Sequence, residues 1–139
     1  RIESLRDRLQ ENALVQEGDR PAEAPENLLT ALREAIARLQ TLIRSINATN
    51  VSAELDDHVK LSDAIVERDM VKLERDAVEQ LVTAASIRQH RFGQNEVKFV
   101  AVIGQAALRG EIDALSKQWR MLDARIQAAN WSTDLREVD

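Results

Sequence analysis

Residues 28–55 read "LLTALREAIARLQTLIRSINATNVSAEL", and this stretch decides the fold because its apolar residues recur with the period of a helix. Steps of four and three residues separate the members of one seam: Leu28, Leu32, Ala35, Leu39, Leu42, Ile46 and Thr49. A heptad seam of this length is typical of a long helix with an antiparallel partner. Pro25 suits the first turn of such a helix, where the missing N–H costs no hydrogen bond. We expect the helix to end near Asn50.

The same pattern returns eighty residues later, where residues 108–135 read "LRGEIDALSKQWRMLDARIQAANWSTDL". The second seam has an apolar residue at each equivalent position, with Trp119 in place of Leu39. The two ends, "INATNVSAEL" and "IQAANWSTDL", share Ile, Ala, Asn, Ser and Leu. A repeat predicts a single domain, 1–139, with halves of about 1–55 and 63–135 and a core formed by the two seams. Chance matching of two amphipathic helices is the alternative.

Two further helices are expected from apolar residues at helical spacing. One opens the chain, and the other covers residues 63–91 with a face wide enough for more than one neighbour: Val66, Met70, Leu73, Ala77, Leu81, Ala84 and Ile87. Short β segments are expected at 51–55 with 59–61, and at 95–103, from their β-branched residues. The predicted fold class is therefore mainly α, with four helices in long antiparallel hairpins and short β segments.

The composition excludes several classes of protein. No apolar run reaches the roughly 18 residues that a membrane-spanning helix needs. The net charge of −5 disfavours general nucleic-acid binding, which depends on positive charge. The chain has no cysteine, which removes disulfides and thiolate metal sites and favours the cytoplasm. A phosphate-binding glycine loop, a nucleophile elbow and zinc-ligand spacing are also missing, so the sequence indicates neither an enzyme nor a cofactor.

Five segments carry a family resemblance, in this order: "NALVQEGDRPAEAP", "LIRSINATN", "LSDAIVERD", "ASIRQHRF" and "ARIQAANWSTDL". Over essentially its whole length the chain resembles an uncharacterised bacterial family sometimes labelled septicolysin. The resemblance implies helical-hairpin subunits that assemble into homo-oligomers such as hexamers, and it implies no activity or catalytic residue. The family often has Asp before the proline of the seam helix and Asp-Gly in the following turn. Here Ala24 and the pair Asp57-His58 stand at these positions.

Asp57 and His58 are candidate metal ligands, together with Asp56 and Glu54, because carboxylates and imidazole bind divalent metals. Adjacent residues seldom point the same way, and no second histidine follows at helical spacing. A solvated polar turn is therefore the favoured interpretation of this stretch.

His90 lies in "SIRQHRFGQNEVKF", where Arg88, Arg91 and Lys98 accompany two phenylalanines. This basic, aromatic stretch predicts contact with an acidic surface of a neighbouring subunit or, less favoured, with RNA. A positively charged helix end, stabilised by the helix dipole, is the preferred structural explanation.

The leading hypothesis is a structural or interaction protein of unknown biochemical role that assembles with itself. Its motivation is a surplus of apolar helix surface for so short a chain. The residues expected at subunit interfaces are Met70, Phe99 and Trp131. An enzyme or metal-binding module with a composite site between subunits is the alternative, drawing on Asp57, His58 and His90. Weak RNA binding through the basic stretch is the third hypothesis.

Overall fold

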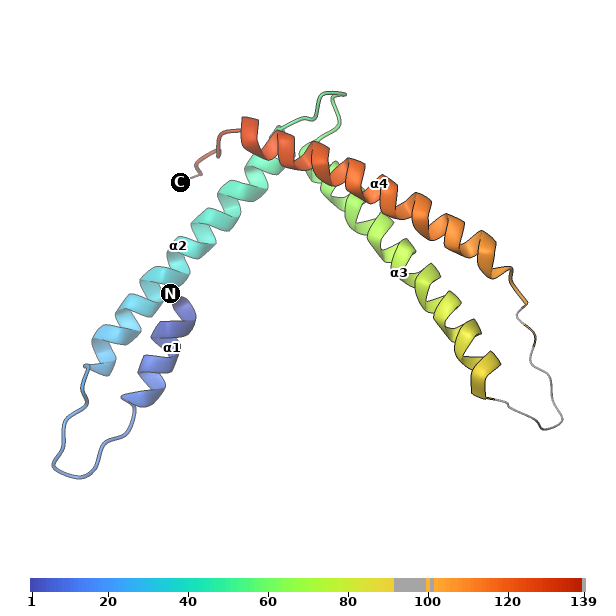
Figure 1. Ribbon diagram of the computed structural model, residues 1–139. Coiled ribbons are helices and arrows are strands. Elements are labelled where there is room, and N and C mark those ends of the chain that lie inside the picture. Colours follow the sequence, from blue (N-terminus) through green and yellow to red (C-terminus); the bar gives the residue numbers. More distant parts are fainter. Residues whose placement is uncertain (92–99, 101, 139) are drawn as a thin grey trace. The chain divides into compact units, whose positions relative to one another are not determined.

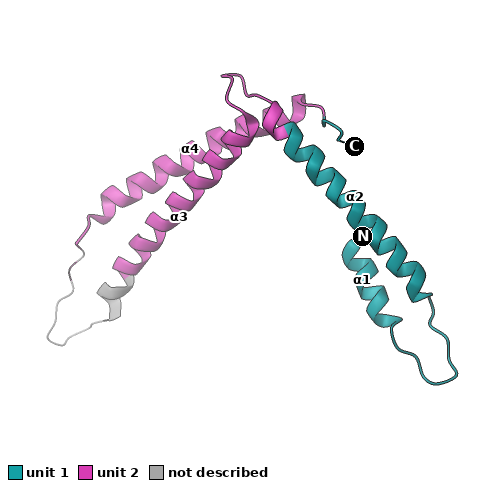
Figure 2. Ribbon diagram, turned by 180° about the vertical axis from the view of Figure 1, so that it is seen from behind, with its two compact units in different colours: residues 1–49, 135–139 teal, residues 50–134 magenta. Residues whose placement is uncertain are grey.

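The computed structural model describes residues 1–91, 100 and 102–138, except for the side chains of residues 87–91. Four helices make up the described fold: α1 (Ile2–Glu11), α2 (Pro25–Ser52), α3 (Leu61–Arg91) and α4 (Gln105–Ser132) (Figure 1). The predicted helical class is confirmed. The chain divides into two compact units, residues 1–49 with 135–139 and residues 50–134 (Figure 2). The single-domain organisation expected from the sequence stays a prediction.

The two repeated seams lie on helices of equal length. α2 and α4 each contain 28 residues, and both their first and their last residues are eighty positions apart. Each helix runs through its asparagine, Asn50 or Asn130, and ends two residues later at a serine. The two repeated helices therefore begin at equivalent positions as well as end at equivalent positions.

Unit 2, residues 50–134, is built on an antiparallel hairpin in which α3 and α4 pack along each other. Its core cluster joins the start of α3 to the end of α4, and its members are Leu55, Leu61, Ala64, Ile126 and Ala129. Leu61 and Ile126 are each 1% exposed. Further along the hairpin, Arg68 Nη1 donates a 2.9 Å hydrogen bond to Asp123 Oδ1. The α4 seam is thus buried against α3.

The expected core of two repeated seams stays a prediction, because α2 and α4 belong to different units. On α2, Leu28 is buried, but the apolar residues of the middle of the helix are 42–49% exposed: Ile36, Leu39, Leu42, Ile43 and Ile46. The seam of α2 lacks the cover that α3 provides for α4 in unit 2. A heptad pattern indicates that a helix packs against a partner, but it does not indicate which helix of the chain is that partner.

The predicted β segments at 51–55 and 59–61 are also wrong, since the described chain forms no strand. The first two residues of this stretch complete α2, which ends at Ser52. A single antiparallel bridge pairs Glu54 with Lys60. The segment between the two helices is too short for a ladder, because α3 already begins one residue after the bridge.

The turn between α2 and α3 is closed by backbone hydrogen bonds. Leu55 N–H donates to Val59 O at 2.8 Å, and Leu61 N–H donates to Ala53 O at 2.9 Å. His58 has φ +64°, the left-handed conformation that glycine adopts most easily. Most of the other expected strand, 95–103, lies outside the described residues, and its described residues are not in a strand.

Unit 1 contains α1, most of α2 and the last residues of the chain. Leu5 of α1 and Leu28 of α2 are buried, and both line one hollow of about 500 Å³. The end of α1, Glu11, lies eighty residues before the end of α3, Arg91. By the repeat, α1 corresponds to the last third of α3. Within the described helices, none is both long and apolar enough to span a membrane.

Candidate interaction surfaces

The outer stripe of α3 is an exposed apolar surface formed by Val66, Met70, Leu73 and Leu81. These residues are 60%, 53%, 63% and 43% exposed, respectively. They recur at helical spacing and share one face of α3. Val71 and Val82, which belong to the face packed on α4, are buried. α3 is therefore apolar on two faces, and unit 2 covers only one of them.

Carboxylates line one side of the outer stripe of α3. Asp63 precedes Val66 by three residues, and Glu67 precedes Met70 by three, so each lies beside the stripe on the helix surface. Glu74 follows Met70 by four residues and lies on the same side. All three are exposed, and within the described part of the chain none makes a hydrogen bond or ion pair. The outer stripe thus has an acidic border.

The α2 stripe is the second exposed apolar surface, and it belongs to unit 1. Its members are 42–49% exposed: Ile36, Leu39, Leu42, Ile43 and Ile46. Two of them, Leu39 and Leu42, line a hollow of about 470 Å³ together with Arg38 and the first turn of α1. Half-exposed side chains in a continuous row are suited to receive another helix.

Arginines flank the α2 stripe. Arg33 precedes Ile36 by three residues and Arg38 precedes Leu42 by four, while Arg44 lies about two turns beyond Ile36. All three are exposed, and no hydrogen bond or ion pair joins them to another residue that the structure describes. The α2 stripe therefore has a basic border, opposite in charge to that of the outer stripe of α3.

The end of the chain covers two polar residues of α2, Ser45 and the seam residue Thr49. Ser45 and Thr49 are 3% and 8% exposed, although serine and threonine are usually at the surface. Arg136 N–H donates to Thr49 Oγ1 at 2.8 Å, and Val138 N–H donates to Ser45 Oγ at 3.2 Å. Residues 135–138 thus cover Ser45 and Thr49, while the apolar side chains of the α2 stripe stay half-exposed. No sequence pattern singled out Ser45.

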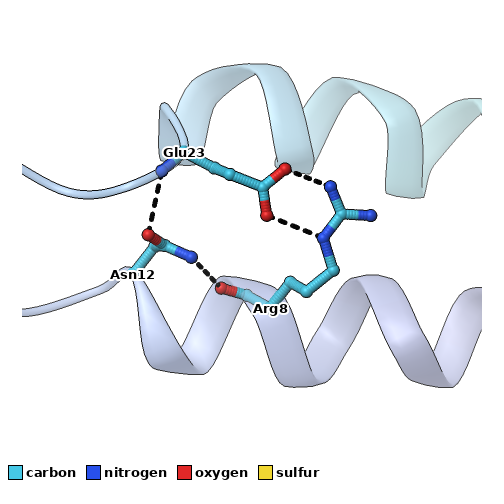
Figure 3. A network of polar contacts seen from close by, with 3 residues as sticks. All are labelled: Arg8, Asn12 and Glu23. Carbon is cyan, nitrogen blue, oxygen red and sulfur yellow. Dashed lines mark hydrogen bonds and ion pairs between the residues drawn. The ribbon is translucent and has the colours of Figure 1, made fainter.

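A polar network fixes the loop between α1 and α2 (Figure 3). Arg8 forms a bidentate ion pair with Glu23. Nε of Arg8 donates to Oε2 of Glu23 at 2.7 Å, and Nη2 donates to Oε1. Asn12 at the end of α1 donates from Nδ2 to Arg8 O at 2.9 Å and accepts at Oδ1 from Glu23 N–H at 3.0 Å. The hydrogen bonds from Arg8 lower the pKa of Glu23. This carboxylate, which lines the larger hollow of unit 1, is therefore ionised and paired.

The candidate metal ligands at the turn are engaged in ion pairs. Arg125 Nη2 lies 2.6 Å from Asp57 Oδ2 and 3.2 Å from Asp56 Oδ1. Its hydrogen bond lowers the pKa of Asp57. Glu54 pairs with Lys60 and lies 3.1 Å from His58 Nδ1, and these hydrogen bonds lower the pKa of Glu54. Each carboxylate already has a cationic neighbour, which opposes the binding of a metal ion.

Of the predicted site residues that the structure describes, Glu54 and His58 lie in contact at the turn, and Met70 and Trp131 lie elsewhere in unit 2. Three or more metal-ligating side chains converge nowhere among the described residues. The side chain of His90 lies outside the described set, as do Phe99 and the side chains of the basic stretch. Met70 lies on the outer stripe of α3, and Trp131 in the last turn of α4 is 91% exposed. Their role as interface residues stays a prediction.

Trp119 has an unusual environment on the α4 seam. It is half-buried, and its indole Nε1 is buried without a hydrogen-bond partner among the residues that the structure describes. Indole N–H groups usually find a partner when buried. The equivalent residue on α2 is Leu39, which has no polar atom in its side chain.

The comparisons with known proteins concern the chain as a whole. A family model described as "Family of unknown function (DUF6847)" matches residues 1–135. A comparison with curated proteins finds no significant match. The chain resembles the crystal structure of a functionally unknown conserved protein from Corynebacterium diphtheriae at 37% sequence identity and a TM-score of 0.89. That match covers 96% of this chain and 88% of the other. The protein therefore belongs to the family of unknown function DUF6847.

Proposed function

We propose that this protein is a structural or interaction protein whose helical subunits assemble with one another. The outer stripe of α3 supports the proposal most directly, because four large apolar side chains there are 43–63% exposed in a continuous row. Contiguous exposed apolar surface of this kind typically marks a protein interface. Met70 lies within the row, and Trp131 adds a nearly fully exposed aromatic side chain elsewhere in unit 2.

The resemblance to septicolysin-like proteins belongs to the same proposal, as does the hexamer that it implies. A closed homo-oligomer buries an apolar stripe on every subunit, which removes the exposed surface from water. No observation in the described residues favours the composite metal or enzyme site, and the basic stretch assigned to RNA lies outside the described side chains. Self-assembly is thus the function that the described surface supports best.

The mass of the purified protein in solution tests this proposal. We expect light scattering and sedimentation at micromolar concentration to give a multiple of the 15.7 kDa chain. Leu73→Glu places a charge in the middle of the outer stripe and should shift the mass toward one chain while the helical circular dichroism is kept.

Thr83→Glu is the matched control, because Thr83 is an exposed residue of α3 outside the stripe. This variant should retain the assembled mass. A wild-type protein that remains a single chain across micromolar concentrations would rule out self-assembly.

A further inference from the structure

We infer that the α2 stripe of one copy binds the outer stripe of α3 of a second copy. This inference rests on the proposed self-assembly and specifies its two surfaces. The contact is heterologous, since each copy contributes a different face, and the two faces on one chain can engage two different neighbours.

The repeat supports a helix as the occupant of the α2 stripe. Leu42 and Ile46 are 42% and 47% exposed, whereas their equivalents on α4, Leu122 and Ile126, are 7% and 1% exposed. In unit 2, an apolar face of α3 covers this part of the seam. The same seam positions on α2 therefore present a pattern that accepts an amphipathic helix lying along them.

Charge selects the outer stripe of α3 as that helix. The α2 stripe is bordered by Arg33, Arg38 and Arg44, and the outer stripe of α3 by Asp63, Glu67 and Glu74. All six side chains are exposed and unpaired in the described chain. When one stripe lies along the other, arginines on one border of the α2 stripe meet the carboxylates that line one side of the outer stripe of α3.

The charges beside the stripes also disfavour a contact between two copies of the same stripe. Two α2 stripes would bring arginines together, and two outer stripes of α3 would bring carboxylates together, which costs free energy at an interface. The bordering charges thus disfavour symmetric contacts and favour the contact between an α2 stripe and an outer stripe of α3.

Charge reversal on each stripe provides the test. The α2 variant carries Arg33→Glu, Arg38→Glu and Arg44→Glu, and the α3 variant carries Asp63→Lys, Glu67→Lys and Glu74→Lys. Each variant alone should self-associate at least tenfold more weakly than the wild type, because its two stripes then carry the same charge. An equimolar mixture of the two variants should assemble again, and so should a single chain that carries all six changes.

The matched control reverses three exposed, unpaired cations on α4, with Arg109→Glu, Lys117→Glu and Arg120→Glu. It changes the net charge by the same amount as the α2 variant and should assemble like the wild type. Circular dichroism on every variant separates a weakened interface from an unfolded helix.

Cysteine cross-linking gives a second, independent readout, since the chain has no cysteine of its own. Ile43→Cys and Leu73→Cys, made in separate chains and mixed, should form mixed disulfide dimers in excess over either homodimer. Preferential homodimers would overturn the inference.

The outcomes separate this inference from the proposed function. An assembled wild type whose two charge variants also assemble normally, alone as well as mixed, overturns the stripe pairing and leaves self-assembly standing. Loss of assembly in each variant without recovery in the mixture also overturns the pairing. A monomeric wild type overturns both proposals.

Discussion

The helices α2 and α4 have the same length and carry the same seam, yet they differ in what covers them. Ile126 on α4 is 1% exposed, and the equivalent Ile46 on α2 is 47% exposed. In unit 2 the covering helix, α3, has 31 residues, whereas its counterpart in unit 1, α1, has ten. Burial of a seam is therefore decided by the length of the helix that faces it. The uncovered part of α2 is the surface that we propose binds a second copy.

Replacing Ile126 and Ile46 by alanine, one at a time, should give the largest difference in the free energy of unfolding. Ile126→Ala removes buried methyl and methylene groups and should lower the free energy of unfolding of unit 2 by about 2 to 5 kcal/mol. Ile46→Ala acts on a half-exposed residue and should cost the isolated subunit about 0.5 kcal/mol or less. Urea unfolding followed by circular dichroism at low protein concentration measures both.

Equal losses of unfolding free energy in the two variants would contradict the difference between α2 and α4, because they would mean that the α2 stripe is buried within the subunit. At high concentration Ile46→Ala should instead weaken assembly. The concentration dependence of its effect thus reports whether the stripe is covered by another copy.

The next prediction compares one polar contact in each unit. Asp123→Ala removes the acceptor of Arg68 between α3 and α4, and Ser45→Ala removes the acceptor of the Val138 amide. Each loss of a part-buried hydrogen bond should cost about 1 kcal/mol. Hydrogen exchange should quicken at the Val138 amide for Ser45→Ala and along the α3–α4 hairpin for Asp123→Ala. Faster exchange in the unit that was not altered would contradict the division into two units.

Each unit also contains a residue with positive φ, and the two should respond in opposite ways. Gly18, in the loop of unit 1, has φ +92°, and Gly18→Ala should destabilise by about 1 kcal/mol through backbone strain. His58 has φ +64°, and His58→Gly should stabilise unit 2 by up to about 1 kcal/mol, reduced by the removal of the side-chain contact with Glu54. Thermal unfolding measures both. A destabilising His58→Gly would show that the side-chain contact with Glu54 outweighs the strain.

The smallest expected effect is a loss of stability in acid. Hydrogen bonds from cationic side chains lower the pKa of Glu23 in unit 1 and of Glu54, Asp57 and Asp76 in unit 2. Because each folded-state pKa lies below the unfolded value of about 4, these groups stabilise the fold above pH 4. Their contribution is lost as the pH falls through the folded-state pKa.

Urea unfolding between pH 7 and pH 2.5 checks this prediction, and unit 2, with three such carboxylates, should lose more than unit 1. The groups are exposed, so added salt should reduce the effect. Glu23→Gln should remove most of the acid dependence in unit 1. A stability that stays constant down to pH 2.5 would contradict the assigned pairs.

The sequence predicted which segments form helices better than it predicted which faces of those helices pack together. The seams of α2 and α4 have strict spacing, so the existence and period of both helices followed from Leu28, Ile46 and their equivalents. α3 is apolar on two faces, and periodicity alone does not show that Val71 faces α4 while Met70 faces outward. The burial of Ser45 depends on a hydrogen bond from a residue 93 positions later, which leaves no local pattern.

The tail of residues 135–138 has a consequence for the order in which the chain folds. The hydroxyls of Ser45 and Thr49 accept hydrogen bonds from amides that are synthesised only after α3 and α4. On the ribosome, where domains generally fold as they are synthesised, the two helices of unit 2 can pair before unit 1 is closed. We therefore expect unit 2 to reach its final structure before unit 1, with the hydroxyls of Ser45 and Thr49 hydrated until the tail has been synthesised.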